Sequence, residues 1–145
     1  MPVTVKPVTL WRKEIENKPG TLAVALEPLA MAGADLQVIM GYRFPGRSDA
    51  AALELFPVKG KKATAAAQAG GLSASTIPTL LVQGDNKAGL GYTIATSIAG
   101  AGINIGFVIA QVVGRKYSAV IGFDTSDDAK MAAILIKKAA ASKKK

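Results

Sequence analysis

Asn17-Lys18-Pro19-Gly20 recurs 69 residues later in the chain as Asn86-Lys87-Ala88-Gly89. At the same offset, the stretch 32–36, which reads Ala-Gly-Ala-Asp-Leu, returns at 101–105 as Ala-Gly-Ile-Asn-Ile. Two distant blocks that agree on one offset indicate an internal duplication. The chain of 145 residues is therefore interpreted as two similar halves.

Both halves show the same predicted order of elements. A strand, at 10–16 and again at 79–83, leads through the Asn-Lys pair into a helix that stops at glycine. Asn17 can cap the first of these helices. Apolar residues spaced three or four positions apart give each helix a buried face: Leu22, Leu26 and Leu29 in the first copy, and Leu90, Ile94 and Ile98 in the second.

Two strands and another helix follow in each half. We predict strands at 35–44 and 51–58 with a helix at 61–69, then strands at 103–113 and 117–123 with a helix at 127–140. In the last helix Ser126 can act as the cap, and the predicted buried face consists of Met131, Ile134 and Leu135.

This order predicts an α+β fold of two tandem ferredoxin-like βαββαβ units, with the helices on one face and the sheets packed side by side. The units are expected at 8–77 and 78–141, followed by a basic tail at 142–145. Residues 72–76 can supply the last strand of the first unit, but no such segment follows the last helix of the second. Because 3–5 precede a proline much as 73–75 do, we predict that residues 2–6 close the second unit.

The composition excludes many kinds of site. The chain has no cysteine and no histidine, so it has no thiol nucleophile, imidazole base or disulfide, and it lacks the commonest metal ligands. We therefore expect no enzyme activity, no catalytic residues, no metal and no cofactor. Glu14 and Glu16 share a strand face and are interpreted as solvated, and the glycines at 100–106 follow a helix, whereas a dinucleotide-binding loop follows a strand.

The net charge of +8 is concentrated in two lysine clusters, at 59–62 and 137–145, which are interpreted as solvated surface and a basic tail. Residues 88–114 carry no charge, but glycines at 89, 91, 100, 102 and 106 and several polar residues interrupt them, and the matching stretch of the first copy carries Glu27, Asp35 and Arg43. We predict no membrane span there. The first residues lack the features of a secretion signal, so the expected location is cytoplasmic.

The doubled Asn-Lys-X-Gly motif, followed about a dozen residues later by Ala-Gly and then Asp or Asn, resembles the ACT domain. ACT domains are ferredoxin-like regulatory modules of enzymes such as aspartate kinase, phosphoglycerate dehydrogenase and prephenate dehydratase. The resemblance covers nearly the whole chain as two tandem copies. It implies that a small effector, often an amino acid, binds where the loop after the first strand meets the second strand of a neighbouring unit.

Carried over by the resemblance, the ligand-binding positions of the first copy are Asn17, Pro19, Gly20, Thr21, Leu22, Asp35 and Leu36. Those of the second copy are Asn86, Gly89, Leu90, Gly91, Asn104 and Ile105. A helix N-terminus can receive a carboxylate, and Asn or Asp oxygens can accept from an ammonium group. The family often has Asp where Asn17 and Asn86 stand, and Ala88 replaces its usual proline.

These features favour a stand-alone regulatory or sensor module that acts by an allosteric shift in population. The expected partners are a small-molecule effector, a second copy of the chain in a homo-oligomer such as a dimer, and a separate regulated enzyme or transporter. Two alternatives remain open. One is an oligomerisation module whose strand edges pair between chains without a ligand, and the other is a nucleic-acid-binding protein, for which strands 51–58 and 117–123 lack the paired aromatics.

Overall fold

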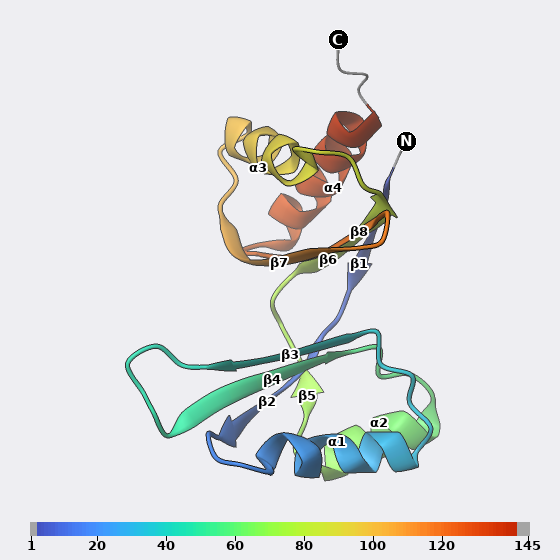
Figure 1. Cartoon of the computed structure of the whole chain (residues 1–145), viewed down its shortest axis with the longest axis vertical. Helices are drawn as coiled ribbons and strands as arrows, with labels where there is room; N and C mark the ends of the chain where they lie inside the picture. The colour runs from blue at the N-terminus through green and yellow to red at the C-terminus, as the bar shows by residue number, and fades with distance from the viewer. Residues whose placement is uncertain (1–2, 142–145) are drawn as a thin grey trace. The chain divides into compact units, whose positions relative to one another are not determined.

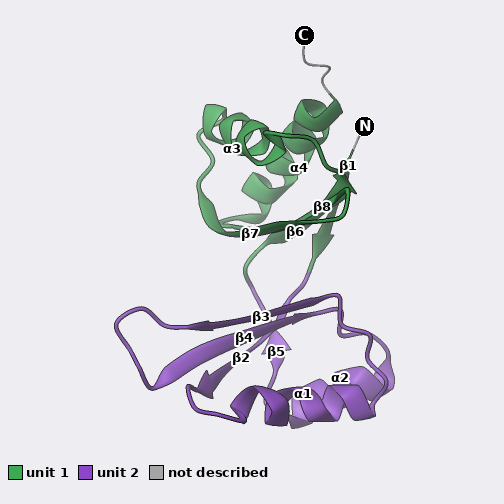
Figure 2. Ribbon diagram, in the orientation of Figure 1, with its two compact units in different colours: residues 1–8, 77–145 green, residues 9–76 purple. Residues whose placement is uncertain are grey.

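The computed structural model describes residues 3–141, which form two compact units (Figures 1 and 2). Unit 1 combines the segment ending at Val8 with the chain from Ile77 onward, and unit 2 is Thr9–Thr76. Together they contain two four-stranded antiparallel sheets and four helices. This confirms the predicted α+β class and the two ferredoxin-like units. Residue 2 and the predicted tail at 142–145 lie outside the described residues.

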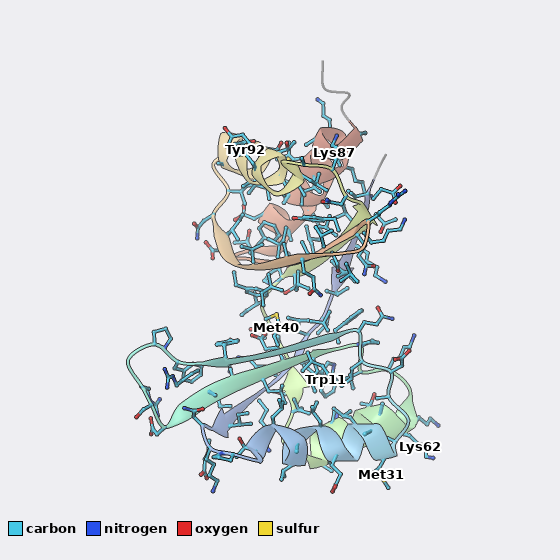
Figure 3. The ribbon with its side chains drawn as sticks, viewed as in Figure 1. Trp11, Met31, Met40, Lys62, Lys87 and Tyr92 are labelled. Atoms are coloured by element: carbon cyan, nitrogen blue, oxygen red, sulfur yellow. The ribbon has the colours of Figure 1, made fainter. Side chains whose placement is uncertain are left out.

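Unit 2 carries the first copy of the repeat. Its sheet has the strand order β3-β4-β2-β5, and two helices cover one face of that sheet (Figure 1). The elements in chain order are β2 (Trp11–Glu16), α1 (Thr21–Met31), β3 (Val38–Arg43), β4 (Ala50–Phe56), α2 (Lys61–Ala69) and β5 (Ser73–Ala74). Leu29 of α1 packs with Leu53 and Leu55 of β4 to form the core, against which Trp11 is placed (Figure 3).

Unit 1 carries the second copy, with the strand order β1-β6-β8-β7. Its elements are β1 (Val3–Val8), β6 (Thr79–Asp85), α3 (Leu90–Gly100), β7 (Ile105–Val113), β8 (Lys116–Phe123) and α4 (Ser126–Ala141). β1 runs antiparallel to β6, from the pair Val3 and Gly84 to the pair Val8 and Thr79. Val3 and Val5 lie in the core, as do the predicted residues Leu90, Ile94 and Ile98. The N-terminal strand thus completes the sheet of unit 1.

The helix starts differ from the prediction at two places. Gly20 precedes α1 with a φ of 90°, and no side chain caps the helix, so the predicted cap at Asn17 was wrong. Asn17 instead donates its side-chain amide to the carbonyl of Ser48 at 2.9 Å. At α4 the N–H of Asp128 donates to the hydroxyl of Thr125 at 3.0 Å. Thr125 is therefore the N-cap residue, a role that we predicted for Ser126. Ser126 is instead the first residue of the helix.

The predicted buried face of α4 was also wrong. Met131 is 49% exposed and Ile134 is 62% exposed, whereas the buried residues are Ala129, Ala132, Ile136 and Ala140. Small side chains on this face let the helix approach the sheet closely, which explains why alanines take the inner positions. On α1, Leu22 is 43% exposed, and Ala25 is buried in its place.

Several strands are shorter than predicted. β3 begins at Val38 rather than at residue 35, and β7 begins at Ile105. β5 contains Ser73 and Ala74 alone instead of residues 72–76. None of the helices between residues 3 and 141 combines the length and apolarity required to cross a bilayer.

Candidate ligand-binding site

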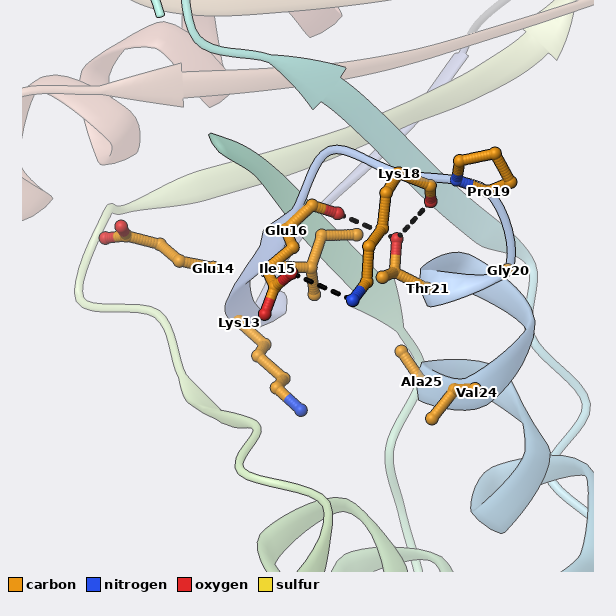
Figure 4. Close-up of a pocket in the computed structure, with 10 residues that line it drawn as sticks. All are labelled: Lys13, Glu14, Ile15, Glu16, Lys18, Pro19, Gly20, Thr21, Val24 and Ala25. Carbon is orange, nitrogen blue, oxygen red and sulfur yellow. Dashed lines mark hydrogen bonds and ion pairs between the residues drawn. The ribbon is translucent and has the colours of Figure 1, made fainter. Parts of the chain in front are cut away.

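A pocket of about 470 Å³ lies in unit 2 between the end of β2 and the start of α1 (Figure 4). It includes three of the residues expected from the repeated motif, Pro19, Gly20 and Thr21. Its other lining residues come from β2, the loop and the first turns of α1: Lys13, Glu14, Ile15, Glu16, Lys18, Val24 and Ala25.

The pocket exists because β5 is short. β5 pairs with β2 at Trp11 and Arg12 alone, so β2 continues past it. Residues 13–16 pair with β4 on one side, and no strand among the described residues pairs with their other edge. Backbone N–H and C=O groups along such an edge remain available to a ligand. The open edge of β2 therefore forms one wall of the pocket.

Two hydrogen bonds to one carbonyl shape the loop at the mouth of the pocket. The carbonyl of Glu16 accepts from the hydroxyl of Thr21 at 2.8 Å and from the N–H of Lys18 at 3.1 Å. The Thr21 hydroxyl also lies 3.0 Å from the carbonyl of Lys18. Gly20 completes the turn with a φ of 90°, a left-handed conformation that glycine adopts without strain. The loop thus fixes the first turn of α1 beside β2.

The start of α1 suits an anion. No side chain caps the helix, and its first turn carries no acidic residue. The aligned peptide dipoles give a helix N-terminus a partial positive charge, and its first N–H groups lack partners within the helix. The N–H of Thr21 donates to the carbonyl of Lys18 at 3.4 Å, so a carboxylate would meet the dipole and the N–H groups that follow Thr21 in the first turn.

The pocket carries charges of both signs. Lys13, Lys18 and Glu16 lie around it, and Lys18 Nζ lies 3.1 Å from Glu16 Oε2, whereas the Glu14 carboxylate points away and lies 3.5 Å from Arg12 Nη1 (Figure 4). The side chains of Lys18 and Glu16 are 62% and 72% exposed, so their ion pair contributes at most about 1 kcal/mol and a charged ligand can replace it. Ile15, Val24 and Ala25 supply an apolar side. The lining therefore fits a small molecule that has both a positive and a negative group.

The remaining predicted residues of the first copy lie elsewhere. Asn17 is bonded to Ser48, and Leu22 is exposed outside the lining. Asp35 lines a second pocket, also of about 470 Å³, which is formed by the end of α1 and the start of α2. Leu36 packs against the core. Within unit 2 the structure does not bring Asp35 and Leu36 to the loop at Pro19.

The second copy repeats the loop but not its open edge. The N–H of Asn86 donates to the carbonyl of Arg115 at 2.8 Å, as that of Asn17 donates to Asp49 at 3.0 Å, and Gly89 has a φ of 82°. However, β1 pairs with β6 up to Gly84, so it covers the edge that is open in unit 2. The residues matching 13–16 are Val, Gln, Gly and Asp at 82–85. The pocket-forming edge is therefore specific to unit 2.

The other predicted residues of the second copy differ in exposure. Leu90 is buried in the core, and Ile105 packs against it. Gly91 and Asn104 are exposed. Tyr92, on the first turn of α3, is 74% exposed (Figure 3).

Four charged lining residues were missing from the sequence-based site: Lys13, Glu14, Glu16 and Lys18. The side chains of Glu14 and Glu16 are 61% and 72% exposed, as the interpretation of a solvated strand face predicts. The indication available in the sequence was the cluster of charged residues at 12–16, directly before the Asn-Lys-Pro-Gly motif. In the part of the chain that the structure describes, no three His, Cys, Asp or Glu side chains form a group that could hold a metal ion.

No family model matches the chain, and no curated protein matches its sequence. Solved structures do match it over most of its length. The protein BT0572 from Bacteroides thetaiotaomicron superposes with a TM-score of 0.72 at 17% identity, covering 88% of this chain and 87% of that one. The ligand-free regulatory subunit of aspartate kinase from Thermus thermophilus gives a TM-score of 0.63 at 17% identity, covering 96% and 97% of the two chains. This chain has a tandem ACT-like fold.

A further regulatory subunit of aspartate kinase, from Thermus flavus, matches the tandem ACT-like chain with a TM-score of 0.60 at 17% identity. The match again covers 96% of this chain and 97% of the subunit. Both ACT-like units thus have counterparts in these subunits.

Proposed function

We propose that this chain is a regulatory module that binds a small amino acid in the pocket of unit 2 and has no catalytic activity of its own. One observation carries the proposal: an open strand edge, a helix start without a side-chain cap and charged residues of both signs all line the same pocket.

The lining suggests how an amino acid would bind. Its carboxylate would lie at the first turn of α1 and near Lys18, where the helix dipole and the ammonium group both attract it. Its ammonium group would then be directed to Glu16 on β2. The side chain would contact Val24 and Ala25, so we expect a small apolar or hydroxylated amino acid to bind best.

The fold supports a regulatory role. Regulatory subunits of aspartate kinase share it over nearly their whole length. A module without catalytic residues transmits a signal only if its ligand binds two states with different affinity. We therefore expect a homo-oligomer that acts on a separate enzyme or transporter.

A thermal-shift screen against the twenty amino acids tests the proposal. A ligand present at 100 times its dissociation constant adds about 2.7 kcal/mol to the free energy of unfolding, which raises Tm by several degrees for a domain of this size. Lys18→Gln should abolish the shift. Lys87→Gln is the matched control, because Lys87 follows Asn86 as Lys18 follows Asn17, and it should retain the shift.

The screen also separates the alternatives. A shift that survives Lys18→Gln, or that Lys87→Gln removes equally, would place binding outside the pocket of unit 2. No shift with any amino acid would favour a module without a ligand. A shift with short RNA that disappears in high salt would favour nucleic-acid binding, because phosphate contacts weaken steeply with salt.

A further inference from the structure

A second cavity of unit 2 has no part in the proposed amino-acid site. It has a volume of about 470 Å³ and lies where the end of α1 meets the start of α2. One wall comes from the segment 32–37 between α1 and β3, and the other comes from the segment 57–63, which leads from β4 into α2. A cavity of this size holds a small organic molecule. Its lining therefore indicates which kind of ligand fits.

The two walls of this cavity are fixed to each other and to the core of unit 2. The backbone N–H of Gln37 donates to the carbonyl of Phe56 at 2.8 Å, which joins the two segments. Val58 packs against the core, and Ala63 lies in it with 6% of its surface exposed. The fold of unit 2 therefore holds both walls in place.

The lining carries more positive than negative charge. Lys59, Lys61 and Lys62 come from one wall, and Asp35 comes from the other (Figure 3). All four residues are exposed. Within residues 3–141, none of their side chains forms an ion pair or a hydrogen bond. The opposite charges thus line the same cavity without contacting each other.

The lysines are in an unfavourable place as long as the cavity holds no anion. Like charges that are close together repel each other. Lys61 and Lys62 also stand in the first turn of α2, where the helix dipole disfavours a cation, and this turn has neither an acidic residue nor a side-chain cap. An anionic ligand would offset both effects. The lysine cluster therefore fits ligand binding better than a role in the stability of α2.

The lining also restricts the kind of anion. Lysine ammonium groups are common partners of phosphate, and three of them match a ligand that has more than one phosphate group. Asp35 would repel a phosphate, but its carboxylate can accept hydrogen bonds from hydroxyl groups, as the acidic residue of dinucleotide-binding folds accepts from a ribose. A ligand with phosphates at one end and hydroxyls next to them matches both walls.

We propose that this cavity binds a ribonucleotide, with its phosphates at Lys59, Lys61 and Lys62 and its ribose hydroxyls at Asp35. The lysine cluster at 59–62, which we interpreted from the sequence as solvated surface, then belongs to a second ligand site. This site goes beyond the proposed function, because the amino-acid pocket lies at the start of α1 and the ribonucleotide cavity lies at its end. Either site can fail its test without affecting the other.

Calorimetric titration of the purified chain with ATP, at constant ionic strength and without divalent cations, tests the proposal. ATP should bind the wild type, and Lys61→Gln/Lys62→Gln should weaken binding by about tenfold or more, because charge-assisted hydrogen bonds are lost. The matched control is Lys137→Gln/Lys138→Gln, which removes the same charge from two adjacent exposed lysines of α4 and should retain the affinity of the wild type.

Tripolyphosphate separates the two ends of the ligand, because it has the phosphates of ATP without the ribose. Lys61→Gln/Lys62→Gln should weaken the binding of both compounds. Asp35→Ala should weaken the binding of ATP alone. Tripolyphosphate should bind this variant at least as tightly as the wild type, because a negative charge has been removed from the cavity.

Acetylation of the wild-type chain locates the site without a variant. Saturating ATP should slow the reaction of Lys61 and Lys62 with acetic anhydride, as measured by mass spectrometry. The reaction of Lys137 and Lys138 should proceed at the same rate with and without ATP.

Four outcomes would overturn the proposal. They are the absence of ATP binding to the wild type, equal weakening by the two double variants, unchanged ATP binding in Asp35→Ala, and unchanged acetylation of Lys61 and Lys62 at saturating ATP. Equal weakening would mean that ATP is attracted by the net charge of the chain and not by this cavity. If Lys61→Gln/Lys62→Gln does not fold, the acetylation rates decide.

Discussion

Asn17 donates its side-chain amide to the carbonyl oxygen of Ser48 at 2.9 Å, and its backbone N–H donates to the carbonyl of Asp49 at 3.0 Å. Two hydrogen bonds thus anchor the loop between β2 and α1 to the hairpin between β3 and β4. The position that we first predicted as a helix cap serves instead to fix the loop that borders the pocket.

Asn17→Asp should destabilise unit 2, because a carboxylate cannot donate to the carbonyl of Ser48. The loss of one hydrogen bond should lower the free energy of unfolding by about 1 kcal/mol. Thermal denaturation at neutral pH measures the effect. Asn86→Asp is the control, since Asn86 holds the equivalent backbone hydrogen bond in unit 1. If both variants lose the same free energy of unfolding, the hydrogen bond from Asn17 to Ser48 does not account for the effect.

Gly122→Ala should destabilise unit 1, because a Cβ at Gly122 would overlap the ring of Phe107 on the neighbouring strand β7. Forcing this ring aside should cost about 1–3 kcal/mol. The double variant with Phe107→Val should recover part of the loss in urea unfolding. Gly41→Ala, where a Cβ meets no atom within 4 Å, should change stability far less. A double variant no more stable than Gly122→Ala would contradict this explanation.

Tyr42→Phe should reduce stability in a pH-dependent way. The hydroxyl of Tyr42 donates to Glu54 Oε2 at 2.8 Å. Burial and then this hydrogen bond raise the pKa of Tyr42 above its ordinary value of 10.0. The folded state therefore holds the phenol proton more tightly than the unfolded state does. The resulting stabilisation is complete below pH 10 and is lost as the pH rises through the raised pKa.

Urea unfolding of the wild type and Tyr42→Phe at about pH 8 and about pH 11 checks this dependence. The wild type should be the more stable protein at the lower pH, and the difference should narrow at the higher pH. A constant difference between the two proteins would mean that ionisation of Tyr42 is not responsible.

Removal of residues 1–8 should unfold unit 1 and leave unit 2 folded. Val3 and Val5 are 6% and 8% exposed in the core of unit 1, and β1 covers the edge of β6. Hydrogen exchange should show lost protection in β6 and α4, with protection retained in β4. Full protection of β6 in the truncated chain would show that β1 is dispensable.

The sequence was sufficient to predict the repeat and the order of elements, because motif spacing and apolar periodicity survive in both copies. The helix at 61–69 was predicted with the bounds that the structure has. The face of α4 could not be predicted by ranking apolar residues by size. Its inner positions are set by how closely the helix approaches the sheet, so alanines are buried while Met131 and Ile134 are exposed.

The sequence predicted the loop of the candidate site but not the wall formed by β2. Pro19, Gly20 and Thr21 line the pocket, and the resemblance to the ACT domain implied a site at these positions. The inclusion of Lys13 and Glu16 depends on where β5 stops pairing with β2. That length is a tertiary property, and residues 72–76 contain no proline or charged residue to mark its limit.

The closure of unit 1 by β1 has a consequence for synthesis. In the linear chain, unit 2 is inserted between the first strand of unit 1 and the rest of that unit. Unit 2 has all of its strands once residue 76 has left the ribosome, so it can fold first. β1 is made before unit 2, yet its partner strand β6 begins at Thr79. β1 must therefore remain without its partner until all of unit 2 and then β6 have been translated.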